Sequence, residues 1–197
     1  MAFSEVQIAN MALSRIGAGQ RISALDEASQ EARACDVHFE PMRNVVLEAF
    51  PWGFANRYAS LGLVEEDPNA DWDYSYRWPV KCLKPLRIVS GVRPDPDPPP
   101  FSIGHDSSGR LIFTNEETAT LFYTEEVTDP QWWSASFASA LAWRLASEIA
   151  FELEASRHLR DSALEMYRQA LVEAEVNDLH GEQPDPLPDS SAVRARD

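Results

Sequence analysis

Apolar residues recur at helical spacing in two segments near the start of the chain. The first segment follows Ser4, and Gln7 stands three residues later, as a helix-capping box requires. The second segment contains Pro41, which should kink the helix or split it in two. It stops before Pro51, because the residue before a proline avoids helical backbone angles. The pattern predicts helices at about residues 4–17 and 29–50.

Two further amphipathic segments lie in the last third of the chain, and they predict helices at about residues 130–154 and 156–177. Asp129 can cap the first of them, with Pro130 at its first helical position, and Ser156 can cap the second. The apolar stripe of the helix that follows Asp129 is wide and rich in alanine, which suggests burial on two sides. The many alanines would also allow neighbouring helices to approach closely.

The helical period disappears in the middle of the chain, between about residues 52 and 125. Short runs of β-branched and aromatic residues, bounded by turn signals, replace it and favour strands. The sequence Ser-Ser-Gly-Arg at 107–110 predicts a hairpin turn between runs at 101–103 and 111–113. The other strand candidates are residues 86–92 and 119–123, and the proline-rich stretch 94–100 predicts an extended loop.

Together these elements predict a mainly α fold, in which a four-helix bundle-like domain carries a β-hairpin or extended insertion between its two helix pairs. The domain is expected to span residues 1–179. Residues 180–197 are polar and rich in proline and aspartate, so they lack the apolar side chains that would offset the entropy cost of ordering. They are predicted to form a flexible C-terminal tail.

The net charge of the chain limits the classes of molecule that it is expected to bind. Among 197 residues, 32 are acidic and 17 are basic, giving a net charge of −15. This disfavours sequence-specific binding of nucleic acid, which usually requires a basic patch, but it allows DNA to pass nearby without sticking. No apolar run is long enough to cross a membrane, and the first residues do not read as a signal peptide. Cys35 and Cys82 are therefore expected to be reduced, buried thiols.

The sequence contains no convincing pattern for catalysis or for binding a metal or cofactor, and the protein is predicted not to be an enzyme. The four histidines and two cysteines lack metal-ligand spacing, and there is no phosphate-binding loop or nucleophile elbow. One enzymatic interpretation remains, a glycosidase-like pair of carboxylates. Glu148 and Glu152 stand one turn apart on the predicted third helix, and residues 65–67 add three acids in a loop. An acidic pair on an alanine-rich helix is usually just its solvated face or a subunit contact, so this interpretation is favoured over catalysis.

The aromatic residues are the strongest candidates for partner contacts, because Trp and Tyr are enriched in protein interfaces. Trp72, Tyr74, Tyr76 and Trp78 alternate with polar residues and should share one side of an extended segment. Filling the core of a small bundle is the favoured role for the aromatic set as a whole, and a subunit or partner interface is the role proposed for part of it. The predicted interface residues are Trp52, Phe54, Trp72, Trp78, Trp132, Trp133 and Trp143, together with Glu148, Glu152, Pro184, Pro186 and Pro188.

Four motifs follow one another over roughly residues 4–176. The first is the second predicted helix and its end, with Arg43, Val46, Leu47, Pro51, Trp52, Phe54 and Ala55, and the second is a later stretch with Tyr76, Pro79, Cys82 and Leu83. The third is the aspartate-led, alanine-rich helix, and the fourth is the last helix, with Leu164, Tyr167 and Ala174. In this order the motifs resemble the bacteriophage head-to-tail adaptor family that includes the tail tubular protein A of short-tailed phages.

The resemblance implies a structural virion protein of the phage neck and tail that assembles in the host cytoplasm. Such a subunit forms a ring, typically of twelve copies, beneath the portal protein, extends the DNA channel and gives the tail nozzle or fibre proteins their attachment site. The alanine-rich stripe of the helix that follows Asp129 is then expected to meet copies of the same chain around a pore. The tail from His180 onward is expected to contact the portal. Two other functions stay open: an acidic protein that binds a host factor by mimicking DNA, and a cell-wall hydrolase.

Overall fold

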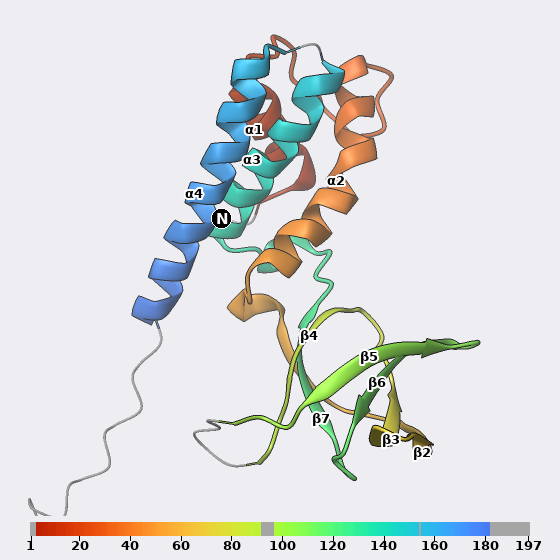
Figure 1. The fold of residues 1–197 in the computed structure, drawn as a ribbon. Coiled ribbons are helices and arrows are strands. Elements are labelled where there is room, and N and C mark those ends of the chain that lie inside the picture. Colours follow the sequence, from red (N-terminus) through yellow and green to blue (C-terminus); the bar gives the residue numbers. More distant parts are fainter. Residues whose placement is uncertain (1–2, 92–96, 154, 182–197) are drawn as a thin grey trace, which may run out of the picture.

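The computed structural model describes residues 3–91, 97–153 and 155–181. Four helices pack as a bundle in which α3 lies at the centre and contacts each of the other three (Figure 1). The helices are α1 (Glu5–Arg15), α2 (Gln30–Ala49), α3 (Ala135–Glu152) and α4 (Arg157–Gly181).

Local chemistry explains where α1 and α2 begin and end. Ser4 and Gln7 form the predicted capping box, with Ser4 Oγ accepting from the Gln7 backbone N–H at 3.1 Å. Gly17 ends α1 in the left-handed conformation (φ 74°). The Gly17 N–H donates to the Ser14 carbonyl and the Ala18 N–H donates to the Leu13 carbonyl, which together form a Schellman motif. Ser29 caps α2, which continues through Pro41 as one helix and is not split. The first helix pair was therefore predicted correctly.

The predicted start of the third helix was wrong. Asp129 and Pro130 begin only a short 3-10 turn, η2 (Pro130–Trp132), and α3 starts at Ala135 with Ser134 as its cap. The break occurs because Trp133 adopts an extended backbone (ψ 130°) and buries its ring in the bundle. At the other end, Ser156 caps α4 as predicted, but α4 runs to Gly181 instead of ending near residue 177.

The alanine stripe of α3 is not a subunit surface. Ala138, Ala142, Ala146 and Ala150 are each fully buried inside this one chain, where α1, α2 and α4 surround α3. Small side chains let these helices approach closely, which explains the composition of the stripe. The interpretation that this stripe meets other copies around a pore is therefore wrong, and any subunit contact must use a different face.

The prediction of a mainly α fold was also wrong, because the middle of the chain is a β lobe with its own core. Seven strands form two antiparallel sheets, so the fold is a mixture of helices and sheets. Sheet A has the order β1-β7-β4 and sheet B the order β2-β3-β6-β5. The strands are β1 (Asn56–Ser60), β2 (Leu63–Asn69), β3 (Trp72–Arg77), β4 (Cys82–Ile88), β5 (Phe101–Asp106), β6 (Gly109–Thr114) and β7 (Thr120–Glu125).

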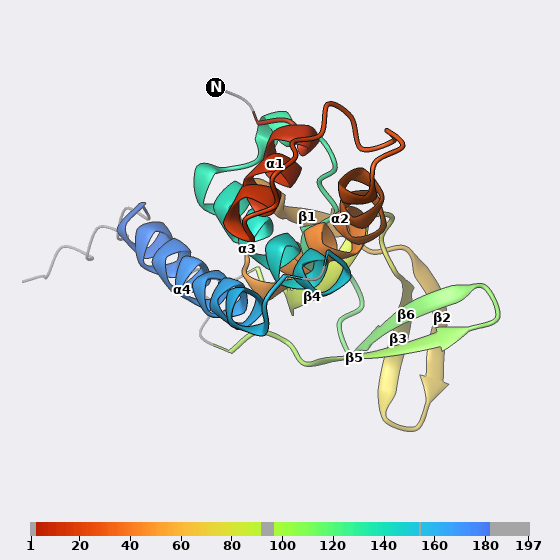
Figure 2. The ribbon, with the colours of Figure 1, turned by 90° about the horizontal axis from the view of Figure 1, so that it is seen from above.

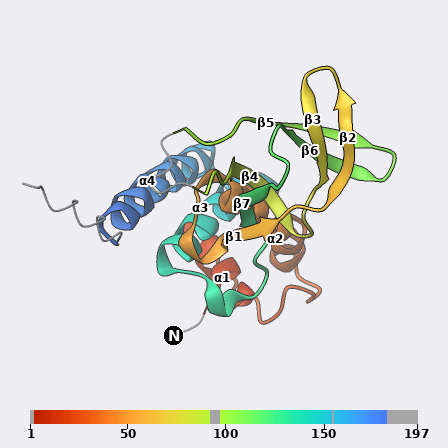
Figure 3. The same cartoon turned by 90° about the horizontal axis from the view of Figure 1, so that it is seen from below.

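Apolar residues from both sheets meet in the core of the β lobe, which includes Tyr76, Ile88, Ile112 and Leu121. Sheet A lies across the lower end of the bundle, and sheet B projects to one side of it (Figures 2 and 3). The predicted hairpin at 107–110 is confirmed as the turn between β5 and β6. The predicted strand at 86–92 is shifted, since β4 begins four residues earlier.

The β5–β6 hairpin is held to β3 by an ion pair whose titration can be measured. Arg77 donates two hydrogen bonds to the Asp106 carboxylate, at 3.0 and 2.9 Å, and these bonds lower the pKa of Asp106 to about 2. A lowered pKa in the folded state means that the contribution to stability is present above pH 3.8 and is lost as the pH falls through about 2.

We expect carboxyl NMR shifts to show Asp106 titrating near pH 2 in the wild type, and at a higher pH in Arg77→Gln, closer to the ordinary value of 3.8. The backbone N–H groups of Ser108 and Gly109 still lower the pKa in that variant. The Glu27 carboxylate, whose pKa is also about 2 because of hydrogen bonds from Ser23, serves as the internal control and should not move. An unchanged Asp106 midpoint in Arg77→Gln would show that Arg77 is not the cause.

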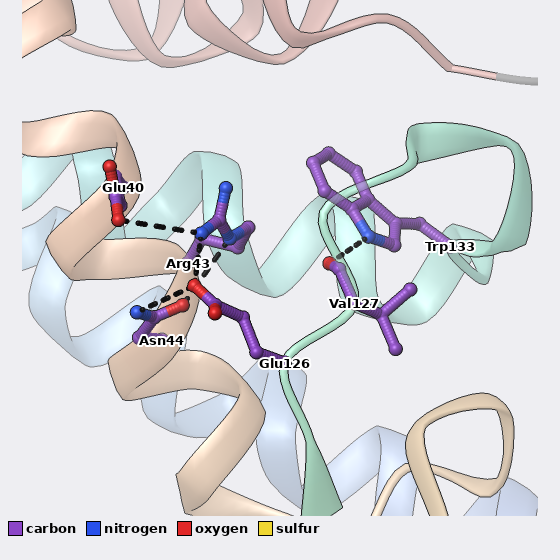
Figure 4. Close-up of polar contacts among 6 residues, drawn as sticks. All are labelled: Glu40, Arg43, Asn44, Glu126, Val127 and Trp133. Atoms are coloured by element: carbon purple, nitrogen blue, oxygen red, sulfur yellow. Dashed lines mark hydrogen bonds and ion pairs between the residues drawn. The ribbon is translucent and has the colours of Figure 1, made fainter. Parts of the chain in front are cut away.

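Polar contacts at the end of α2 join the bundle to the β lobe (Figure 4). The buried guanidinium of Arg43 donates to the Glu126 carboxylate at 2.8 Å, and Asn44 Nδ2 donates to the same oxygen at 3.3 Å. Lys84 on β4 donates to the backbone carbonyl of Glu48 at 2.9 Å. These contacts fix sheet A against the bundle and so position the surface between them.

Candidate interaction surface

A groove of about 510 Å³ opens where the end of α2, the beginning of β1, the turn η2 and the last part of α4 come together. Four of its ten lining residues are aromatic, so we call it the aromatic groove. It brings together three of the predicted interface residues, Trp52, Phe54 and Trp132. Its lining residues are Phe50, Trp52, Gly53, Phe54, Asn56, Trp132, Ser134, Ser136, Ala174 and Asn177.

The base of the aromatic groove is rigid. The Trp52 ring is almost fully buried and packs edge-on against Phe50 and Phe137, at centroid distances of 4.9 and 5.2 Å. The indole N–H of Trp52 donates to the Val46 carbonyl at 2.8 Å, which fixes the ring against the last turns of α2. Trp52 and Phe54 therefore shape the groove and belong to the bundle core.

Trp132 differs from these rings because 63% of its surface is exposed. It stands in η2, where the chain passes from the β lobe back to the bundle. Exposed tryptophans that border a rigid apolar groove are typical anchors in protein interfaces. Among the predicted interface residues, Trp132 is the aromatic side chain best placed to contact a partner.

Asn56 adds an unused polar group to the aromatic groove. Its Nδ2 donates to the Pro51 carbonyl at 3.1 Å, but its Oδ1 is buried and finds no hydrogen-bond partner in the described part of the chain. Thr124, its register partner across β1 and β7, has an equally unpartnered Oγ1. A buried acceptor left without a donor costs roughly 1–3 kcal/mol. Both oxygens are buried, so this cost falls on the β1–β7 pair itself and not on the exposed surface of the groove.

The face of sheet A that begins at Asn56 continues as a row of aromatic and cationic side chains. Tyr58 follows on the same face of β1, is 62% exposed, and lies 4.7 Å from the ring of Phe122 on β7. The guanidinium of Arg87 on β4 lies over the other side of Phe122, 5.2 Å from its centroid. The sequence did not reveal this row, because β1 was not recognised as a strand.

The other predicted aromatics do not join the aromatic groove. Trp133 is buried against Phe137, and Trp143 lies partly buried beneath Arg15 on the bundle. Trp72 and Trp78 are half-buried at the two ends of β3, where Trp78 donates to the Cys82 carbonyl. The predicted set is therefore divided between the core, the β lobe and one exposed surface.

Glu148 and Glu152 lie at the opposite end of α3, and each has a partner. Glu148 pairs with Arg144 on the same helix, and Glu152 lies 3.4 Å from the His38 imidazole on α2. They line a separate groove of about 550 Å³ together with Phe151, which is 80% exposed. Among the described residues, no group of three acids, histidines or cysteines is placed to hold a metal ion.

Negative charge gathers on sheet B instead. Partial desolvation raises the pKa of the Tyr74 hydroxyl, and the carboxylates of Glu117, Glu66 and Asp73 raise it further. These acids come from β2, β3 and the loop between β6 and β7, which the sheet brings together. The sequence alone indicated only the acidic group at residues 65–67. Glu117 joins the acids near Tyr74 through strand pairing, which the sequence does not show.

The remaining predictions concern the cysteines and the prolines. Cys35 and Cys82 are free and buried, as predicted, and burial raises the pKa of each thiol to about 12. Pro184, Pro186 and Pro188 lie outside the described residues, as does part of the loop 94–100. Within the described ranges, no helix combines the length and the apolar character needed to cross a membrane.

The comparisons with known proteins add no family to this description. No family model matches the chain, and no curated protein matches it.

Proposed function

We propose that this chain is a structural virion protein, a head-to-tail adaptor subunit that assembles as a ring beneath a phage portal. The observation that carries the proposal is the aromatic groove, with Trp132 exposed at its border. An exposed tryptophan beside a preformed groove is what an interface presents before its partner arrives, because the apolar ring gains from being covered.

The positions of the family-like motifs support the same proposal. Arg43 and Trp52 hold the junction between the bundle and the β lobe, and Tyr76 and Cys82 lie in the core of the β lobe. Residues at such positions determine how two lobes are oriented, so a shared motif set favours a shared architecture with the adaptors it resembles. The acidic side chains around Tyr74 give sheet B a face that would repel passing DNA.

The test is to mix the full chain with the portal protein from the same genome and to look for an added ring by negative-stain electron microscopy. We expect Trp132→Ala to weaken binding to the portal at least tenfold, the effect of losing an interface anchor. Its folding free energy should change by less than about 1 kcal/mol, because the ring is largely exposed.

Phe151→Ala is the matched control, since it also removes an exposed aromatic but lies at the other end of α3, about 24 Å along the helix axis from the start of α3. It should bind the portal like the wild type. If wild-type chain and portal form no complex at micromolar concentration, the adaptor proposal is rejected. If Trp132→Ala and Phe151→Ala lose portal affinity equally, the aromatic groove is not the portal-binding surface.

The acidic cluster on sheet B favours one second candidate, a protein that binds a basic host factor by mimicking DNA. Glu66, Asp73 and Glu117 converge around Tyr74 and would face the partner's lysines and arginines. In that case, replacing these three acids with glutamine or asparagine would abolish capture of a DNA-binding host enzyme, and Trp132→Ala would not affect it.

A further inference from the structure

A second groove, of about 650 Å³, lies on the exposed side of α1, and we call it the Arg15 groove. Apolar and cationic side chains alternate along it, with Phe3 and Met11 beside two arginines. No acidic side chain lines it. Its lining residues are Phe3, Gln7, Asn10, Met11, Ser14, Arg15 and Arg21.

The Arg15 guanidinium is held in a fixed position. It stacks on the Trp143 ring at 3.9 Å, and it donates to the backbone carbonyl of Ser139 at 3.0 Å and to the Ser139 hydroxyl at 3.3 Å. These contacts use one face of the side chain and two of its five N–H groups. The guanidinium is therefore already oriented, and its remaining N–H groups are available to a carboxylate.

No carboxylate compensates the charge of Arg15 within the described residues, even though acids outnumber bases almost two to one in the chain. Burial lowers the pKa of Arg15 to about 10, so the side chain stays charged at neutral pH. A half-buried cation without a counter-ion is costly, and an incoming anion relieves that cost. The groove thus fits a segment that carries carboxylates beside an apolar side chain.

The chain itself contains such a segment after α4. In residues 182–189, Asp185 and Asp189 stand on either side of Leu187, and prolines separate them. The aspartates match the two arginines of the groove, and the leucine matches Phe3 and Met11. Prolines restrict the backbone, so less entropy is lost when the segment binds.

We propose that residues 182–189 of one copy bind in the Arg15 groove of a second copy, an inference that rests on the proposed ring assembly. The last turns of α4, from which this segment continues along the chain, lie at the periphery of the molecule and away from α1 (Figures 1 and 2). Eight extended residues span at most about 28 Å, which suits a neighbouring subunit standing next to the end of α4.

The experiment uses the full chain with its own segment disabled by Asp185→Asn and Asp189→Asn. A fluorescent peptide of residues 182–190 is titrated against it, and binding is followed by anisotropy. We expect saturable binding at micromolar concentration that weakens as salt rises. Adding Arg15→Gln to the receptor, or both asparagines to the peptide, should each weaken binding at least tenfold.

Arg168→Gln is the matched control for the receptor, because Arg168 is exposed on α4 and pairs with Glu165. It should leave the peptide affinity unchanged within twofold. Sedimentation of the unmodified chain should show self-association that increases with concentration and is lost in Arg15→Gln. If Arg15→Gln perturbs folding, the peptide with both asparagines still tests the charge interaction, because the receptor is then unchanged at Arg15.

Three results would overturn the inference. The peptide could fail to bind the receptor even at millimolar concentration, or it could bind the Arg15→Gln receptor as tightly as the receptor with Arg15. The segment could also bind within its own chain, in which case sedimentation would show no self-association that depends on concentration. A peptide that binds the portal but not the Arg15 groove would also exclude a second copy as its site. None of these results would affect the Trp132 test, so the proposed function and this inference fail separately.

Discussion

Trp133→Ala should destabilise the protein by about 3–5 kcal/mol, whereas the same change at the adjacent Trp132 should cost less than about 1 kcal/mol. Trp133 is buried, packs against Phe137 at a centroid distance of 5.4 Å, and donates its indole N–H to the Val127 carbonyl at 3.0 Å. Removing it leaves a large cavity and an acceptor without its donor. Trp132 loses little because water already covers most of its ring.

Urea unfolding, followed by far-UV circular dichroism, measures both free energies. Trp133→Phe is a useful intermediate, since it keeps most of the ring volume but not the N–H, and it should lie between the wild type and Trp133→Ala. Equal losses for Trp132→Ala and Trp133→Ala would contradict the assignment of one tryptophan to the core and the other to a partner surface.

The second large effect is expected at the junction of the two lobes. Glu126→Ala should cost about 2–4 kcal/mol at neutral pH, because it leaves the buried guanidinium of Arg43 without its closest carboxylate. The other nearby carboxylate, Glu40, lies 3.9 Å away and is exposed, so it compensates poorly. The free energy of unfolding can be obtained from urea titrations as before.

A second substitution distinguishes the loss of a charge partner from the loss of packing. Arg43→Met combined with Glu126→Ala should recover at least half of the stability lost in Glu126→Ala, since no buried charge then remains. If the double variant is as unstable as the sum of the two single variants, Arg43 and Glu126 act independently and the pair does not join the lobes.

The helices could be predicted from the sequence because their signals are local. Ser4, Ser29 and Ser156 each accept a backbone N–H within three residues, and the apolar spacing that follows needs no distant partner. The end of the bundle around Asp129 was mispredicted for the same reason. Asp129 and Pro130 are a correct local signal for one turn, but burial of Trp133 then ends that turn.

The β lobe was underestimated because its strands depend on their neighbours. β2 exposes nearly all of its side chains and contains Glu65, Glu66 and Asp67, so it has no alternation of apolar and polar residues. It forms a strand because β3 provides the hydrogen-bonding partner. Such edge strands leave little trace in a single sequence, and the fold therefore appeared more helical than it is.

The candidate site was predicted in part. Tryptophan content drew attention to Trp132 and Trp133 alike, but the sequence could not tell which of the two is exposed, because that depends on how the backbone turns between them. The unpartnered oxygen of Asn56 and the fixed guanidinium of Arg15 depend on contacts across β1–β7 and α1–α3. Neither feature can be inferred from the spacing of residues along the sequence.

In the described part of the chain the backbone passes between the lobes twice, and a tryptophan is fixed at each passage. Trp52 donates to the carbonyl six residues before it, and Trp133 does the same on the return. Both rings pack against Phe137 of α3, and the Arg43–Glu126 ion pair joins α2 to the second passage. We therefore expect a force applied to the sheets to be shared by both connections and transmitted into α2 and α3.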